Sequence, residues 1–188
     1  MLKADLLTIS KAAQKLCDGA VIAYPTEAVY GLGCDPRSEA SVRRILQLKS
    51  RPAEAGLILI ADRFEHFAPY VARVPDEWLQ RAMAVWPGPV TWLFPRRPDT
   101  PDWLAGAHPT IALRVTAHPV AAELCARFGG ALVSTSANPR AQDPARTPAE
   151  VEAYFGNAIE GIVEGSLGAC GKPSEIRDLA SGRIARKG

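Results

Sequence analysis

The sequence lacks the features that mark several large classes of protein. It contains 4 cysteines and 3 histidines in 188 residues, and the cysteines are too widely spaced for a paired zinc or redox motif. No uncharged apolar run approaches the roughly 18 residues of a membrane span, and the N-terminus has no signal-peptide core. We therefore expect a cytoplasmic protein with reduced thiols, no membrane contact and no metal centre of its own.

A strong excess of one charge is also missing. Lysine and arginine total 22 against 20 aspartate and glutamate, so the formal charge of +2 is below that of a dedicated polyanion-binding protein. With 47% apolar and 22% charged residues the chain can bury a core, which excludes a disordered chain. The length favours one domain, which we expect to span residues 1–188. Any anion-binding function must therefore depend on where the charges lie.

Helical and extended patterns alternate along the chain, which predicts an α/β fold with a large mixed sheet. The expected helices cover residues 9–18, 38–48, 63–71, 76–86, 118–128 and 147–154. The expected strands cover residues 21–24, 56–60, 89–94, 110–116, 131–134, 158–164 and 174–186. Residues 25–33 are expected to form a glycine-rich loop, and Trp86 is expected to fill the core rather than to stack on a base.

The strand that contains Arg114 alternates in polarity. Because alternate residues of a strand share a face, Ile111, Leu113 and Val115 are expected to point into a core, with Arg114 on the opposite face. There the guanidinium is flanked by small residues and hydroxyls, including Thr110, and has room to bind an anion through two parallel hydrogen bonds. The alternative is an arginine on a solvated strand face.

A second polar face follows an apolar strand. Ser134, Ser136 and Asn138 share it at the carboxyl end of that strand, where open α/β sheets bind ligands. Their short hydroxyl and amide groups let a ligand approach the backbone and offer both donors and acceptors. The alternative is an ordinary polar turn that begins at Asn138 and Pro139.

Two cations follow the second expected helix. Pro52 pushes Arg51 into extended backbone, so Lys49 and Arg51 are expected to project together and to suit a polyphosphate. The alternative is a helix end that carries basic residues because the helix macrodipole favours them.

Six segments together resemble the YrdC/TsaC family, the threonylcarbamoyl-AMP synthases, in their short, single-domain form. They are PTEAVYGLGCDP at 25–36, LKSRP at 48–52, WPGPVT at 86–91, LRVTAHP at 113–119, VSTSAN at 133–138 and PSEIRD at 173–178. Their order and spacing extend over nearly the whole chain. The set is therefore specific, although each segment alone is a weak signal.

The resemblance implies a single YrdC-like domain, in which a large twisted mixed sheet, flanked by helices, surrounds a deep basic cavity. It implies a nucleotidyltransferase that condenses L-threonine, bicarbonate and ATP to threonylcarbamoyl-adenylate and pyrophosphate. Downstream proteins would then transfer the threonylcarbamoyl group to the tRNA adenosine beside the anticodon. Mg²⁺ is expected to arrive with ATP, because no carboxylate pair stands out to hold it.

The resemblance also implies roles for individual residues. Threonine is expected to be bound by Thr26, Arg114, Ser134 and Ser174. The nucleotide is expected to be bound by Lys49, Arg51, Thr110, Ser136, Asn138 and Arg186. Lys49 and Arg51 are also the expected catalytic residues, because they would offset charge on the leaving pyrophosphate. Longer relatives have a histidine where this chain has Ile58, a serine where it has Pro144, and a further C-terminal domain for which this chain has no residues.

Two other functions are compatible with the sequence. One is an RNA-binding module in tRNA or ribosome maturation, and the other is carbamoyl transfer as in the related domain of hydrogenase-maturation proteins. Residues 36–52 contain five basic residues, including Arg37, Arg43 and Arg44, against one glutamate, whereas residues 148–164 contain four glutamates and no basic residue. This polarity favours a local anion site over a broad RNA-binding face.

Overall fold

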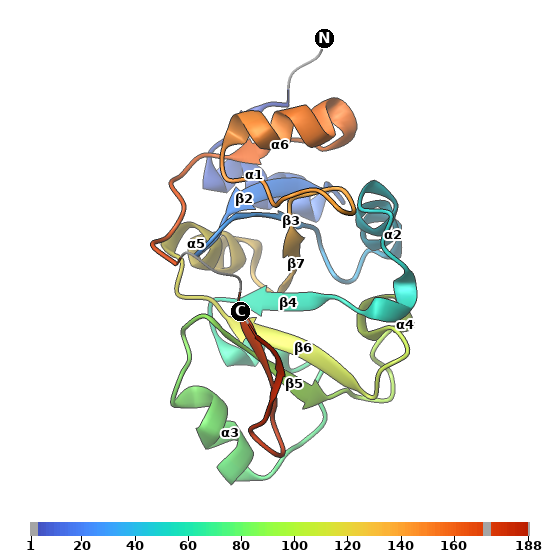
Figure 1. The fold of residues 1–188 in the computed structure, drawn as a ribbon, viewed down its shortest axis with the longest axis vertical. Helices are drawn as coiled ribbons and strands as arrows, with labels where there is room; N and C mark the ends of the chain where they lie inside the picture. The colour runs from blue at the N-terminus through green and yellow to red at the C-terminus, as the bar shows by residue number, and fades with distance from the viewer. Residues whose placement is uncertain (1–3, 171–173, 188) are drawn as a thin grey trace.

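The strands of this protein form one mixed sheet. The structure is a computed structural model that describes residues 4–170 and 174–187. Over that part of the chain, ten strands lie in the order β1-β8-β2-β3-β7-β4-β6-β5-β9-β10 (Figure 1). Their bounds are β1 Leu6–Leu7, β2 Ile22–Pro25, β3 Tyr30–Gly33, β4 Ile58–Ala61, β5 Val90–Pro95, β6 Thr110–Val115, β7 Leu132–Ser136, β8 Ile162–Val163, β9 Glu175–Asp178 and β10 Ile184–Arg186.

The strand pairing is both parallel and antiparallel. β4 runs parallel to β6, whereas β7 is antiparallel to both of its neighbours, β3 and β4. The pair β5 and β9 is parallel, and β9 and β10 close the sheet as an antiparallel hairpin. The predicted α/β class with a large mixed sheet is therefore confirmed.

Helices lie around this sheet in Figure 1, with α6 at the end near the N-terminus and α3 at the opposite end. Their bounds are α1 Ile9–Cys17, α2 Glu39–Leu48, α3 Asp76–Met83, α4 Asp102–Ala105, α5 Pro119–Phe128 and α6 Pro148–Phe155. The helices α1 and α5 pack their buried faces against one side of the sheet through apolar side chains that include Leu16 and Leu124. Short 3-10 turns occupy Ala53–Ala55, Phe64–Phe67 and Gly156–Ala158.

The core has two parts because both faces of the central strands are apolar. In β2, Ile22 and Tyr24 belong to the cluster under α1 and α5, whereas Ala23 belongs to the larger cluster on the other face. Trp86 lies in that larger cluster and stacks on Phe94 with ring centroids 5.8 Å apart. The expectation that Trp86 fills the core is confirmed.

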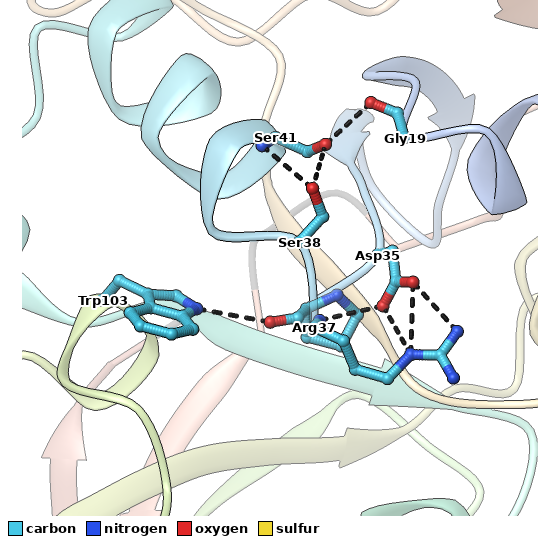
Figure 2. Close-up of polar contacts among 7 residues, drawn as sticks. Gly19, Asp35, Arg37, Ser38, Ser41 and Trp103 are labelled. Carbon is cyan, nitrogen blue, oxygen red and sulfur yellow. Dashed lines mark hydrogen bonds and ion pairs between the residues drawn. The ribbon is translucent and has the colours of Figure 1, made fainter.

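The segment that leads into α2 is fixed by polar contacts, which Figure 2 shows. The Ser38 hydroxyl caps the helix by accepting from the Ser41 backbone amide, and the Ser41 hydroxyl donates to the Gly19 carbonyl at 2.7 Å. The indole of Trp103 donates to the carbonyl of Pro36 at 3.4 Å, which links this segment to α4. These contacts orient α2 and so the basic residues that follow its last turn.

Several sequence predictions are wrong in part, and one of them, the expected strand at 158–164, is reduced to β8 at Ile162–Val163. The expected loop at 25–33 contains β3, which pairs with both β2 and β7. The expected helix at 63–71 is reduced to the turn Phe64–Phe67, because Pro69 has no amide proton to donate. The expected strand at 174–186 is the β9–β10 hairpin. The two-residue strand β1 and the four-residue helix α4 were not predicted, because periodicity needs a longer segment to be visible.

Glycine explains why β3 escaped prediction. Gly31 and Gly33 alternate with Tyr30 and Leu32, so one face of the strand has no side chains. A Cβ atom on Gly33 would lie 2.6 Å from the Val133 carbonyl oxygen and 2.6 Å from the Tyr24 ring. The strand therefore passes directly beneath an aromatic ring that a larger residue would displace.

No helix in residues 4–170 or 174–187 is long and apolar enough to cross a membrane. All four cysteines are free thiols, and Cys34 and Cys125 are buried.

Replacing Gly33 with alanine tests this close packing. We expect Gly33→Ala to lower the free energy of unfolding by about 1–3 kcal/mol, because the added methyl group meets backbone as well as a ring. Gly130→Ala is the control, since its Cβ would meet Phe128 only at 3.6 Å. Urea denaturation measures the free energy of unfolding of both variants. If Gly33→Ala were as stable as Gly130→Ala, the packing described for β3 would be contradicted.

Candidate active site

A cavity of about 410 Å³ lies where β3, β4, β6 and β7 meet the β9–β10 hairpin. Seven of the ten residues predicted from the sequence to bind ligands line it, namely Thr26, Arg51, Arg114, Ser134, Ser136, Ser174 and Arg186. Thr110 lines a neighbouring hollow, and Lys49 and Asn138 line another. Arg51 borders all three spaces, so the predicted residues form one continuous site.

Arg114 is the most deeply placed cation of the cavity. It is 7% exposed, while Ile111, Leu113 and Val115 of the same strand point into the larger core cluster. The alternation predicted from the sequence is confirmed, and the alternative of a solvated strand face is wrong. The guanidinium forms an ion pair with Glu27, with Nη1 at 2.5 Å from Oε2, while its buried Nε has no hydrogen-bond partner.

Glu27 is the functional candidate that sequence reasoning missed. Its second carboxylate oxygen accepts a hydrogen bond from the Thr116 hydroxyl at 2.7 Å. Burial raises the pKa of Glu27, but the charge and hydrogen bond of Arg114, with the Thr116 bond, outweigh burial and keep this pKa below its usual value. Among the described residues that line the cavity, Glu27 is the one carboxylate. No local pattern in the sequence marked this residue, because its partner Arg114 lies in a distant segment of the chain.

Hydroxyl groups surround Arg114 on three segments of the chain. Thr26 is buried in the β2–β3 loop, where its hydroxyl donates to the Val29 carbonyl at 2.7 Å. Ser134 on β7 is 7% exposed and lines the same cavity. Ser174 enters from the start of β9, and its hydroxyl lies 3.0 Å from that of Thr91. The polar face after the apolar strand is therefore part of a cavity wall rather than an ordinary surface turn.

The Lys49 ammonium group is hydrogen-bonded within the protein rather than free to contact a ligand. Its ammonium group donates to the carbonyl of Ser136 at 2.5 Å, to the carbonyl of Asn138 at 2.7 Å and to Asn138 Oδ1 at 3.1 Å. All three of its protons are engaged by the turn that ends β7. Burial, with the nearby charge of Arg51, lowers the pKa of Lys49 to about 8. The ammonium therefore holds this turn in place and adds positive charge beneath it.

Arg51 has a different arrangement, although it lies two residues away. Ser50 turns the chain with φ +47°, and the Arg51 guanidinium donates to the carbonyl of Gly56 at 2.8 Å. Lys49 and Arg51 border one hollow, as the sequence predicted, and neither has a carboxylate partner in the described part of the chain. Arg186 of β10 borders the cavity and one hollow together with Arg51, and it donates to the Ser174 carbonyl at 3.3 Å.

The upstream arginines are not available to the site. Arg37 is held by Asp35 with Nη2 2.9 Å from Oδ2, as Figure 2 shows. Arg43 pairs with Glu39, and Arg44 pairs with Glu160 at 2.6 Å. The upstream part of the basic run is therefore paired with carboxylates, two of them nearby in the sequence and one, Glu160, from a distant segment. The positive charge of the run is concentrated at Lys49 and Arg51.

A cavity and adjoining hollow lined by arginine, lysine and hydroxyl groups in an α/β domain suit small anionic ligands. Comparison with known proteins makes the class more precise. The family model Sua5/YciO/YrdC, described as "Telomere recombination", matches residues 14–188. The chain belongs to this family, as the resemblance of its six segments implied.

Curated relatives match nearly the whole chain. A threonylcarbamoyl-AMP synthase of Halorhodospira halophila is 54% identical over 179 residues, which are 95% of this chain and 94% of the relative. A threonylcarbamoyl-AMP synthase of Klebsiella pneumoniae is 50% identical over 182 residues, 96% of this chain and 95% of the relative.

Solved structures confirm the YrdC-like fold. Sua5 of P. abyssi complexed with L-threonine is 32% identical with a TM-score of 0.85 over 92% of this chain, and this chain spans 51% of that longer protein. E. coli YciO is 25% identical with a TM-score of 0.80, over 99% of this chain and 92% of its own. Full-length HypF, at 14% identity and a TM-score of 0.76, shares the fold alone.

Lys49 makes the stability of the fold depend on pH. Since its pKa is about 8 when folded and 10.5 when unfolded, the unfolded chain binds more protons between these values. We expect the free energy of unfolding of the wild type to rise relative to Lys49→Met by about 1–2 kcal/mol from pH 8 to pH 10.5, after allowance for solvent screening. Denaturant titrations at several pH values measure this difference.

The exposed Lys11 on α1 provides the matched control. The difference between the wild type and Lys11→Met is expected to stay flat over the same pH range. If the difference in free energy of unfolding between the wild type and Lys49→Met were also independent of pH, Lys49 would not be held in a desolvated site.

Proposed function

We propose that this protein is a threonylcarbamoyl-AMP synthase that condenses L-threonine, bicarbonate and ATP to threonylcarbamoyl-adenylate and pyrophosphate. The synthase class that the sequence implied is confirmed by the curated relatives, which have this name and about half of their residues in common with this chain. The observation in the structure that supports the proposal most directly is the buried Arg114 guanidinium among hydroxyl groups, with a second cationic wall at Lys49 and Arg51.

The Arg114 wall suits the amino acid. A guanidinium binds a carboxylate through parallel hydrogen bonds, and the hydroxyls of Thr26 and Ser134 provide donors and acceptors for the threonine hydroxyl and amine. Ile58 and Pro144, which replace a histidine and a serine of longer relatives, both line this cavity. They supply apolar surface for the threonine methyl group, and the absent methyl of serine is worth about 1–3 kcal/mol of discrimination.

The Lys49 and Arg51 wall suits the triphosphate. Arg51 borders the main cavity and both neighbouring hollows, so it can contact phosphates at any of these positions. Lys49 acts mainly through the turn at Ser136 and Asn138, which it holds by three hydrogen bonds. Thr110 lines a hollow that Arg51 also borders, and we propose that it contacts the nucleoside there. Arg186 lines the same hollow from β10.

The chemistry needs positioning more than a covalent catalyst. The threonine amine and bicarbonate form a carbamate with loss of water, and a carbamate oxygen attacks the α-phosphorus of ATP as pyrophosphate leaves. The chain holds the two reactants in line, excludes water and stabilises the growing charge on pyrophosphate through Arg51 and the charge of Lys49.

Magnesium enters as part of the nucleotide substrate. No group of three histidine, cysteine, aspartate or glutamate side chains suitable for a metal ion occurs in residues 4–170 and 174–187. The one carboxylate of the described cavity lining, Glu27, is already paired with Arg114. We therefore propose that Mg²⁺ is bound by the oxygens of ATP and by water.

The product is a mixed anhydride that hydrolyses readily, so we propose that downstream proteins take it over and transfer the threonylcarbamoyl group to the tRNA adenosine beside the anticodon. Direct contact of this chain with RNA has less support. Arg37, Arg43 and Arg44, which made up most of the basic run in the sequence, are paired with carboxylates.

The proposed reaction is tested by incubating the purified protein with ATP, Mg²⁺, L-threonine and labelled bicarbonate. We expect pyrophosphate release that depends on threonine and a labelled adenylate in equal amount. EDTA is expected to abolish both products, and excess Mg²⁺ to restore them. Folded protein that binds ATP but forms no labelled adenylate would contradict the proposal.

A further inference from the structure

We propose that Glu27 is a positioning residue for the substrate carboxylate: it fixes the Arg114 guanidinium in one orientation and leaves only its terminal nitrogens for a ligand. The inference rests on the proposed function in one respect, because it takes the carboxylate to be that of L-threonine. Glu27 itself does not touch the substrate in this proposal.

The Glu27 carboxylate is fixed at both oxygens. Oε2 lies 2.5 Å from Arg114 Nη1, and Oε1 accepts the Thr116 hydroxyl at 2.7 Å. Oε2 is buried, and this ion pair is its contact with a charged side chain in the described part of the chain. Both carboxylate oxygens are thus engaged by side chains of the protein, which favours a positioning role for Glu27 over that of a base for the threonine amine.

The Glu27 backbone is fixed as well. The segment after β8 lies against the β2–β3 loop, where Gly168 N donates to the Thr26 carbonyl and Cys170 N donates to the Glu27 carbonyl, both at 3.0 Å. A Cβ atom on Gly168 would lie 2.9 Å from Glu27 Cα. This close approach restrains the Glu27 backbone, so the carboxylate has little freedom to follow a moving partner.

The hydrogen-bond donors of Arg114 show which edge remains for a ligand. A guanidinium has five N–H donors. Nε is buried without a partner and Nη1 faces Glu27, so the donors left for the cavity are those of Nη2 and the second proton of Nη1. The substrate carboxylate is therefore bound end-on by the two terminal nitrogens. This geometry sets the direction in which the threonine amine points.

Without Glu27 the guanidinium would lose this fixed direction. The side chain of Arg114 is 8% exposed, and Glu27 is its one carboxylate partner in the described part of the chain. A buried guanidinium that loses its counter-charge moves toward solvent or another acceptor. The substrate carboxylate would then meet a displaced and mobile partner, while the Lys49 and Arg51 wall would be unchanged.

The test is Glu27→Gln, which preserves side-chain size and an oxygen for the Thr116 hydroxyl. We expect the Kd and the KM for L-threonine to rise about tenfold or more, because the ion pair that orients Arg114 is lost. The KM for ATP is expected to change by less than about twofold. Calorimetric titration of L-threonine onto the full chain gives the Kd without turnover, and the pyrophosphate assay gives both KM values.

Glu160→Gln is the matched control, because Glu160 also pairs with an arginine, Arg44, at 2.6 Å but lies outside the cavity. Its threonine affinity is expected to be unchanged even where stability falls. Thr116→Val is the second variant: it removes the bond to Glu27 together with the one that Thr116 accepts from the His118 backbone amide, and it is expected to raise the threonine Kd about two- to fivefold.

The outcomes separate the inference from the proposed function. Weaker threonine binding in Glu27→Gln, or in Thr116→Val if the first variant does not fold, with ATP unaffected, supports the inference even if no adenylate is formed. Unchanged threonine affinity in either folded variant overturns it. Equal losses for threonine and ATP also overturn it, because they indicate a general structural role.

Discussion

A positive charge buried at the centre of a sheet needs a counter-charge, and the site of this protein is arranged around that need. Arg114 is almost inaccessible on β6, and Glu27 supplies the opposite charge from the β2–β3 loop. A buried guanidinium without a carboxylate would be strongly destabilising. The loop must therefore lie beside Arg114, and it is also held by the backbone amides of Gly168 and Cys170, which donate to the carbonyls of Thr26 and Glu27.

The strand order explains how distant residues meet at this place. β3, β7, β4 and β6 are neighbours in the sheet, so Thr26 before β3, Ser134 on β7 and Arg114 on β6 border one cavity. The β9–β10 hairpin pairs with β5 and adds Ser174 and Arg186 from the last part of the chain. One end of the cavity is thus hydroxyl-rich around a paired arginine. The other end, at Lys49 and Arg51, has excess positive charge.

The sequence predicted those features that depend on local periodicity. Alternation placed Arg114 opposite a core face, and the run at Ser134 and Ser136 was assigned to a ligand-facing strand end. Glycine hid β3, because residues without side chains give no apolar pattern at Gly31 and Gly33. The remaining candidate binding residues came from motifs whose order matches that of a family. The structure brings these residues together but does not assign their roles.

Contacts between distant segments were not predictable. The Arg114 partner Glu27 and the Lys49 acceptors at Ser136 and Asn138 lie far away in the chain. Composition alone also overstated the basic run, because Arg44 is neutralised by Glu160 from a different element. Ion pairs of this kind form only in the tertiary structure. The spacing of buried residues and the residue types that favour turns can, in contrast, be recognised within a short stretch of sequence.

The central claim is that the cavity has an amino-acid end at Arg114 and a triphosphate end at Lys49 and Arg51. Parallel titrations of L-threonine and ATP onto Arg114→Lys and Arg51→Ala test it most directly. The account predicts that Arg114→Lys, which still offers a charge to Glu27 but lacks the planar fork, loses threonine affinity and retains ATP affinity, and that Arg51→Ala does the reverse. An equal loss of affinity for L-threonine and ATP in both variants would contradict the separation of the site into an amino-acid end and a triphosphate end.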